Sequence, residues 1–262
     1  MDVIKSIEER SSFALLSQIV NGDNPDIASD NENYFIARTR IGLPTWVWTK
    51  EGICEDKVKE VKSIMESFLT DNEKDSFTCK KSFYDVLKRD EFKCLNSDYY
   101  EMGSYYCPST IEPRKSEGKV RLATSDDVDI LTKYNMWDLK EIENIDISYE
   151  ESLKGIVDLV DKNIFYVWVD NNDKIVCTAV LKTNGKFARI NHVYTPVEAR
   201  CKGYAKNLIY VLTNKALEEG FTPVLYTDYN YPASNKAYKA VGYIDTGVLI
   251  NFSCSKQKLK KI

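Results

Sequence analysis

Hydrophobic and polar positions follow the most regular pattern in the second half of the chain. Short runs of β-branched and aromatic residues predict strands there. These strands are 120–123, 164–169, 175–181, 187–195, 223–227, 243–245 and 248–252. Apolar residues at three- and four-residue spacing predict helices after Ser125 and over 149–162, 205–219 and 235–241, the last capped by Ser234. The predicted order, β-α-α-β-β-β-α-β-α-β-β, is typical of a sheet covered by helices.

The first half has a less regular pattern. Helices are predicted over 3–20, 56–69 and 81–89, the last with Thr78 as a cap, and strands over 34–38, 45–49 and 99–107. Polar residues 23–33 predict a loop. Trp46 and Trp48 fall on one face of a predicted strand. Two indoles on a sheet can form a ligand platform, but packing against helix 56–69 is the more common role for such residues.

A change in composition divides the chain. Residues 108–119, PSTIEPRKSEGK, combine prolines, serines, a glycine and mixed charge, which predicts a linker or a domain boundary. The predicted organisation is an N-terminal α/β domain, a linker, a second domain and a lysine-rich tail. Their bounds are 1–112, 113–119, 120–254 and 255–262.

Residues 187–212 form the most informative stretch, because a predicted strand, a basic loop and a predicted helix follow one another. Pro196 ends the strand, since proline has no N–H to donate to a neighbouring strand. The loop carries Arg200, Lys202 and Gly203. Free N–H groups at a helix start, together with the helix dipole, bind anions and most often phosphate. The stretch therefore predicts an anion site.

Composition narrows the possibilities further. The chain has 262 residues, 43% hydrophobic and 29% charged, which is typical of a globular protein. A net charge of −4 gives no general case for nucleic acid or an anionic membrane as partner. The seven cysteines include no C-x-x-C pair, and His192 is the only histidine, which argues against zinc and against a disulfide scaffold. No signal peptide or membrane-spanning run is evident, so we expect a cytoplasmic protein.

Two motifs give the second half a family resemblance. V-Y-T-P-x-x-R-x-K-G-Y-A spans Val193–Ala205, and S-N-K-A-Y-K-A-V-G-Y spans Ser234–Tyr243, with a predicted strand between them. Together with the order of elements, they resemble the GCN5-related N-acetyltransferase (GNAT) family over about residues 118–254. The resemblance implies an α/β (α+β) fold with a mixed, mainly antiparallel sheet flanked by helices. Cys201 and Ala205 replace two of the family's glycines; both are small, so we expect the loop to survive.

The resemblance implies acetyl-CoA as co-substrate and no metal. The pyrophosphate would lie on the backbone N–H groups of Arg200, Cys201, Lys202, Gly203, Tyr204, Ala205 and Lys206. The side chains of Arg200 and Lys202 would add positive charge; the alternative is a solvated loop without a ligand. Val193 and Thr195 would pair with the pantetheine arm like an added strand. The N–H of Val193 or Tyr194 would stabilise charge that develops on the acetyl oxygen.

Acetyl transfer to an amine needs two proton transfers. An alkyl ammonium with a pKa near ~10 must lose a proton before it attacks, and the leaving thiolate benefits from an acid. The resemblance implies Tyr238 as that acid, although its ring could instead only pack against the cofactor. Asn235, one turn earlier, would contact the coenzyme. The candidates for the base are His192, Glu198 and Asp228, and family members often relay this proton through water.

Two classes of function agree with these observations. The first is an N-acetyltransferase acting on a primary amine, either a small molecule or a protein amine. The second is a non-catalytic CoA-binding sensor or scaffold, and an acyltransferase that uses another acyl-CoA is a variant of the first. We expect no nucleic-acid or membrane partner, and a monomer or homodimer. The first half could be a degenerate, non-catalytic GNAT-like copy whose aromatic residues line an acceptor pocket or form a second core.

Overall fold

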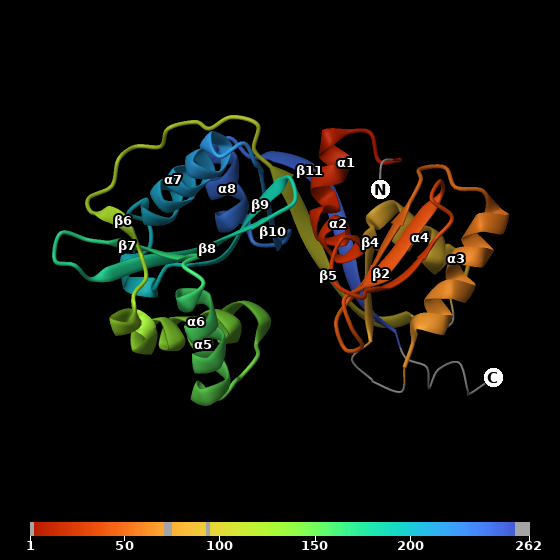
Figure 1. The fold of residues 1–262 in the computed structure, drawn as a ribbon, viewed down its shortest axis with the longest axis horizontal. Helices are drawn as coiled ribbons and strands as arrows, with labels where there is room; N and C mark the ends of the chain where they lie inside the picture. The colour runs from red at the N-terminus through yellow and green to blue at the C-terminus, as the bar shows by residue number, and fades with distance from the viewer. Residues whose placement is uncertain (1–2, 71–74, 93–94, 255–262) are drawn as a thin grey trace. The chain divides into compact units, whose positions relative to one another are not determined.

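The computed structural model describes residues 3–70, 75–92 and 95–254 (Figure 1). Contacts divide the chain into two compact units, each made of discontinuous segments. The first unit comprises Met1–Tyr105, Tyr226–Pro232 and Asp245–Ile262, and the second comprises Tyr106–Leu225 and Ala233–Ile244. This division differs from the predicted domains, because the strand that begins at Ile244 joins the first unit from Asp245 onward rather than the domain predicted at 120–254. The predicted tail, 255–262, lies outside the described residues.

The first unit is a sheet with helices on both faces. Its helices are α1 (Ile7–Ser12), α2 (Ala14–Val20), α3 (Glu55–Phe68) and α4 (Lys81–Arg89). Its strands are β1 (Asp26–Ser29), β2 (Tyr34–Arg38), β3 (Thr45–Thr49), β4 (Ser76–Lys80), β5 (Leu95–Tyr106) and β11 (Ile244–Cys254), in the order β1-β2-β3-β4-β11-β5. β3 and β4 run parallel, whereas β1–β2, β2–β3 and β4–β11 are antiparallel.

The two tryptophans of β3 are core residues, as predicted, but they pack against a different helix pair. Trp46 and Trp48 are buried in a cluster with Phe13 and Leu16 of the α1–α2 region. The helix predicted at 56–69, now α3, covers the opposite face of the sheet, where it packs against Val47. Side chains alternate along a strand, so neighbouring residues of β3 serve two different cores.

The sequence pattern placed several helices and strands of the first half wrongly. The helix predicted over 3–20 is two helices, because buried Phe13 leaves helical geometry between them (φ −108°, ψ 28°). Part of the predicted loop 23–33 is strand β1. Thr78 lies within strand β4, and Lys80 precedes α4 at the capping position.

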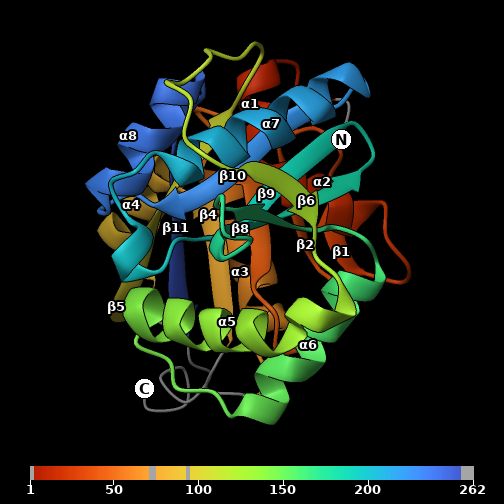
Figure 2. The ribbon, with the colours of Figure 1, turned by 90° about the vertical axis from the view of Figure 1, so that its left-hand side faces the viewer.

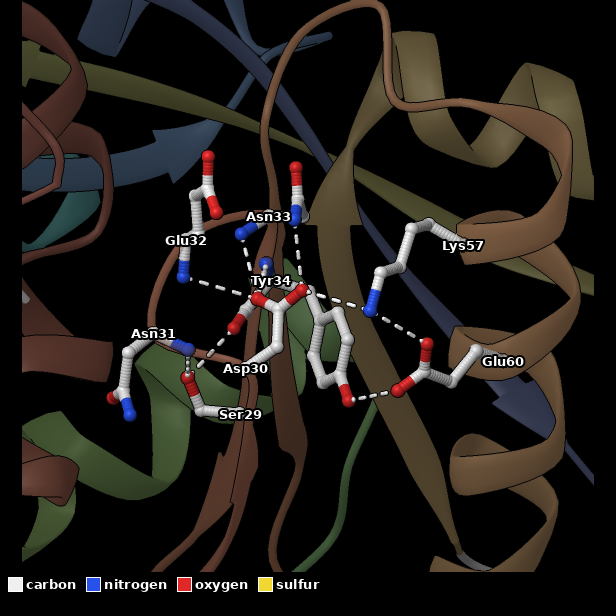
Figure 3. A network of polar contacts seen from close by, with 8 residues as sticks. All are labelled: Ser29, Asp30, Asn31, Glu32, Asn33, Tyr34, Lys57 and Glu60. Atoms are coloured by element: carbon white, nitrogen blue, oxygen red, sulfur yellow. Dashed lines mark hydrogen bonds and ion pairs between the residues drawn. The ribbon is translucent and has the colours of Figure 1, made fainter.

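A polar network fastens the β1–β2 turn to α3 (Figure 3). The Asp30 carboxylate accepts hydrogen bonds from the backbone N–H groups of Glu32, Asn33 and Tyr34, at 3.0, 2.6 and 3.2 Å. Lys57 of α3 forms ion pairs with both Asp30 and Glu60, at 3.1 and 2.8 Å. Burial by itself raises the pKa of Asp30. The hydrogen bonds and Lys57 lower this pKa by more than burial raises it, so the carboxylate stays ionised. The network holds the β1–β2 turn against α3, which is a structural role.

The second unit is a sheet enclosed between helices. It begins with β6 (Lys119–Leu122), α5 (Val128–Glu143), α6 (Tyr149–Asp161) and β7 (Phe165–Val169). It continues with β8 (Ile175–Asn184), β9 (Phe187–Tyr194), α7 (Tyr204–Glu218), β10 (Thr222–Asp228) and α8 (Pro232–Val241), of which Tyr226–Asp228 and Pro232 are counted with the first unit. Its strand order is β10-β9-β8-β7-β6. α5 and α6 cover one face, and α7 covers the other (Figure 2). The predicted mixed, mainly antiparallel sheet flanked by helices is confirmed.

The two halves of the chain repeat one order of elements. In each half a pair of helices precedes three consecutive antiparallel strands, and a helix, a strand, a helix and a long strand follow. In each half the strand after the middle helix also pairs in parallel with the strand before that helix. A degenerate copy of one fold would retain this shared order.

The described helices include none that is long and apolar enough to cross a membrane. Cys54, Cys79, Cys107, Cys177 and Cys201 carry free thiols. Cys254 is disulfide-bonded.

Candidate functional site

The predicted anion loop lies between β9 and α7. Two of its residues have left-handed backbone geometry, Cys201 with φ +63° and Gly203 with φ +86°. Glycine reaches this region without cost, whereas a residue with a Cβ is strained there. Cys201 therefore stands where the backbone itself favours glycine. The loop nevertheless keeps its turn and leads into the first turn of α7 at Tyr204.

A basic cavity of about 480 Å³ opens at the start of α7. Its lining residues come from the loop, the first turn of α7 and the segment before β6, and they are Arg114, Lys115, Ser116, Glu117, Cys201, Lys202, Gly203, Tyr204 and Lys206. Four of these nine carry positive charge. The cavity combines cationic side chains with a helix N-terminus, which is the chemistry that binds phosphate groups.

The segment 107–118, which we call the strap, is hydrogen-bonded to the loop and to the start of α7. The Ser116 hydroxyl donates to the Lys202 carbonyl at 2.7 Å, and the Asn207 amide donates to the Arg114 carbonyl at 3.0 Å. The Tyr204 hydroxyl donates to the Glu117 carboxylate at 2.9 Å. The sequence predicted only a linker here. The contribution of Arg114–Glu117 to the cavity was missed, although the cluster R-K-S-E-G-K was its signal.

Arg200 does not line this cavity. Its guanidinium donates to the Thr195 carbonyl at 2.9 Å and makes a two-pronged contact with Glu141 of α5, at 2.7 and 2.6 Å. The hydrogen bonds from Arg200 lower the pKa of Glu141. The expectation that Arg200 adds positive charge to the anion site is therefore weakened, since a carboxylate already balances that charge. Ala205, on the first turn of α7, is not among the lining residues either.

The pairing of β9 with β10 ends before the loop is reached. They pair in parallel only from Phe187 to Arg189 on β9 and from Thr222 to Val224 on β10. Within the second unit, β9 continues to Tyr194 and β10 to Leu225, with no further register pair between the described residues. The end of β9, including Val193 and Tyr194, thus leaves the partner strand where the sequence predicted room for an extended ligand.

A β-bulge at His192 alters the predicted strand geometry. Tyr194 lies opposite Thr178 of β8, and Asn191 lies opposite Val180, so β9 contains one extra residue. His192 adopts φ +50°, and the strict alternation that would turn it away from Val193 is broken. His192 lines a small cavity with Leu131, Tyr134, Asn135, Asp138, Phe165, Thr178 and Tyr194.

The charge state of His192 bears on its candidacy as a base. The imidazole keeps solvent contact, but desolvation by the surrounding protein lowers its pKa to about 4, with repulsion from Lys182 and Arg189 as the next causes. His192 is therefore neutral at pH 7. A base whose conjugate acid has so low a pKa removes a proton from an ammonium poorly.

The remaining predicted site residues lie on other elements. Helix α8 begins at Pro232, so Ser234 is inside the helix rather than its cap, and Asn235 and Tyr238 are on its first turns. Tyr238 is 8% exposed, and its ring meets the edge of the Tyr243 ring at a centroid distance of 6.1 Å. The roles of Tyr238 and Asn235 remain predictions. Of the other candidate bases, Glu198 pairs with Lys174 at 3.4 Å.

The described residues contain no group of three or more His, Cys, Asp or Glu arranged to hold a metal ion. Residues 129–243 match the family model described as the acetyltransferase (GNAT) family. These residues form a GNAT-family domain. The matched residues begin within α5 and end at Tyr243, so they contain β9, the loop, β10 and α8.

Solved structures resemble the whole chain, beyond the GNAT domain. An acetyltransferase of the GNAT family from Colwellia psychrerythraea is 13% identical, with 96% of this chain and 99% of that chain covered and a TM-score of 0.61. A GCN5-related N-acetyltransferase from Kribbella flavida is 12% identical, with 95% and 96% covered and a TM-score of 0.62. At such identities the likeness shows the fold alone, and it extends over both halves. No curated protein matches the chain at a significant level.

Proposed function

We propose that this protein is an N-acetyltransferase that transfers the acetyl group of acetyl-CoA to a primary amine. The observation that carries the proposal is the basic cavity at the start of α7, a helix of the GNAT-family match, together with the end of the β9–β10 pairing at Arg189 and Val224. The cavity suits phosphate groups, and the separated strands suit an extended arm that pairs with a strand edge.

The residues fit the coenzyme by their donor chemistry. Arg114, Lys115, Lys202 and Lys206 supply cations around the cavity, and the N–H groups from Cys201 to Lys206 supply hydrogen-bond donors. The backbone at the end of β9, from Val193 to Thr195, is offered to the pantetheine arm along the edge away from β8, although the Thr195 carbonyl already accepts a hydrogen bond from Arg200. When bound, acetyl-CoA supplies an activated thioester.

The chain's own groups then serve the transfer. The N–H of Val193 or Tyr194 stabilises the negative charge that develops on the acetyl oxygen. Tyr238 donates a proton to the leaving sulfur. The incoming amine loses its proton through water rather than to His192, whose low pKa makes it a poor base.

Thiol release from acetyl-CoA, measured over a panel of amines, tests the proposal. Tyr238→Phe should lower kcat about 10²- to 10⁴-fold, the usual contribution of a general acid, while acetyl-CoA binding stays within about twofold. Tyr210→Phe, which removes a hydroxyl from α7 away from the cavity, is the matched control and should leave kcat unchanged. Parallel assays with succinyl-CoA test the choice of acyl donor.

Two outcomes would contradict the proposal in different ways. Binding of acetyl-CoA without turnover on any amine, and with no effect of Tyr238→Phe, would indicate a CoA-binding module. If calorimetry detected no binding of acetyl-CoA, the cavity would not be a coenzyme site.

A further inference from the structure

The strap holds the backbone of Arg114 and Lys115 beside the anion loop. The Asn207 amide donates to the Arg114 carbonyl at 3.0 Å. On the other side of Lys115, the Ser116 hydroxyl donates to the Lys202 carbonyl at 2.7 Å. These bonds use a backbone carbonyl and a serine hydroxyl, so the side chains of Arg114 and Lys115 take no part in holding the strap.

The strap is also held where it leads into β6. The Trp168 indole of β7 donates to the Glu117 carbonyl at 2.8 Å. At the next residue the backbone runs directly against β7, because a Cβ on Gly118 would lie 2.0 Å from the Val169 carbonyl oxygen. The strap backbone is therefore in position before a ligand arrives, which lowers the entropy lost on binding.

The cavity keeps an excess of positive charge. Its cations come in two pairs, one from the strap and one from the loop and the first turn of α7, namely Arg114 with Lys115 and Lys202 with Lys206. None of these four side chains forms an ion pair or a hydrogen bond with another residue that the structure describes. The one carboxylate among the lining residues, Glu117, accepts from the neutral hydroxyl of Tyr204 at 2.9 Å. The cavity thus holds four cations and a single carboxylate, and that carboxylate pairs with none of them.

This charge exceeds what the pyrophosphate of the coenzyme would balance. Pyrophosphate within the coenzyme carries about two negative charges, and the cations and N–H groups of the loop and of α7 suffice for them. The coenzyme bears one further anion, a phosphate monoester on its ribose, with a charge of about −1.5 to −2 at neutral pH. The two cations of the strap match this second anion in sign and in number of charges.

We infer that Arg114 and Lys115 bind the ribose phosphate monoester of acetyl-CoA, whereas Lys202 and Lys206 serve its pyrophosphate. This inference rests on the acetyl transfer proposed above. It makes the strap the part of the protein that distinguishes acetyl-CoA from acetyl-dephospho-CoA, which lacks only that phosphate. A guanidinium can contact two phosphate oxygens at once, and an ammonium adds a point charge. The strap precedes residues 129–243, so this selectivity belongs to a segment outside the family match.

Calorimetric titrations with acetyl-CoA and acetyl-dephospho-CoA test the inference. At low ionic strength the protein should bind acetyl-CoA about tenfold or more tightly than acetyl-dephospho-CoA, as charge-assisted hydrogen bonds allow, and this preference should shrink as salt is added. In R114Q/K115Q the preference should fall to within about twofold. The double variant should keep the urea midpoint of the parent protein, because neither side chain has a partner in the described part of the chain.

Two single variants are the matched controls. Lys202→Gln should weaken the binding of both ligands alike and keep the preference, since it removes a cation assigned to the pyrophosphate. Lys119→Gln removes an exposed cation at the start of β6 that does not line the cavity, and it should change neither affinity.

Phosphorus NMR of bound CoA gives a second readout that needs no turnover. A phosphate monoester has a second pKa of about 6, whereas the pyrophosphate does not titrate in that range. Neighbouring cations favour the dianion, so the pKa of the bound monoester should be lower than in free CoA, and R114Q/K115Q should abolish this decrease. Equal affinity for the two ligands, or a preference that survives in R114Q/K115Q, would overturn the inference even if the protein is an acetyltransferase. A preference that R114Q/K115Q abolishes, without turnover on any amine, would support the phosphate site and count against the proposed catalysis.

Discussion

Substitution of Gly203 by alanine measures how strongly the strap depends on the loop. A Cβ at this position would lie 2.8 Å from the Ser116 hydroxyl oxygen. That hydroxyl donates to the Lys202 carbonyl at 2.7 Å and accepts from the Asn207 amide at 3.1 Å, so moving it breaks both hydrogen bonds. Gly203→Ala should therefore incur the left-handed strain, about 1–2 kcal/mol, and lose two hydrogen bonds of about 1 kcal/mol each.

Gly220 provides the matched control. Its φ of +81° is close to the +86° of Gly203, but a Cβ there would meet nothing within 4 Å. Gly220→Ala should cost only the backbone strain, about 1–2 kcal/mol. Urea unfolding gives the free energy of unfolding of each variant, and fits with a shared m-value give the difference in cost between the two positions. Equal losses at the two positions would refute the idea that Ser116 holds the strap against the loop. Acetyl-CoA titrations should show weaker binding for Gly203→Ala alone.

Three further predictions concern the second unit. Cys201→Gly should stabilise the protein by up to about 1 kcal/mol in urea unfolding because it relieves left-handed strain, whereas Cys201→Ala, which keeps that strain, should not. Asp127 accepts two hydrogen bonds from Arg121, at 2.6 and 2.9 Å, and these bonds lower the pKa of Asp127 in the folded protein. The stabilisation that Asp127 gives to the fold is therefore present above its pKa in the unfolded chain, near ~4. It is lost as the pH falls through its pKa in the folded protein. Asp127→Asn should thus cost about 1.5–3 kcal/mol at pH 7 and progressively less below pH ~4, and a constant cost across that range would contradict the assignment. The double variant R114Q/K115Q should bind acetyl-CoA roughly tenfold more weakly at low ionic strength, with the difference shrinking in high salt; an effect independent of salt in calorimetry would exclude direct charge attraction.

The sequence predicted the elements that local pattern determines. The order of strands and helices after residue 120 and the strand-loop-helix around Gly203 follow from periodicity and turn residues over short stretches. The strap was not predictable in this way, because Ser116 and Lys202 are 86 positions apart in sequence. The bulge at His192 also escaped prediction, since an inserted residue leaves no periodic signature in a short strand.

The first-half errors have a similar physical origin. Strands β1 (DIAS) and β4 (SFTCK) are short and carry polar residues, whereas β2 (YFIAR) and β3 (TWVWT), which are as short, carry the apolar and aromatic residues that mark a strand. Trp46 and Trp48 were correctly expected to be buried, but only the tertiary fold decides which helix pair covers a given face of a strand. Arg200 appeared to be a free cation because its partner, Glu141, is 59 positions away.

The place of β11 has a consequence for the synthesis of the protein. This strand is the last of the described elements to leave the ribosome, yet it pairs with β4 from Leu249 to Ser253 and stands between β4 and β5. Until it arrives, β4 has an open edge with unpaired backbone groups, the kind of edge that recruits other chains. The first unit therefore cannot be completed in step with translation. Its folding awaits a contact of very high sequence separation, and nascent or truncated chains that lack β11 should be the forms most prone to aggregate.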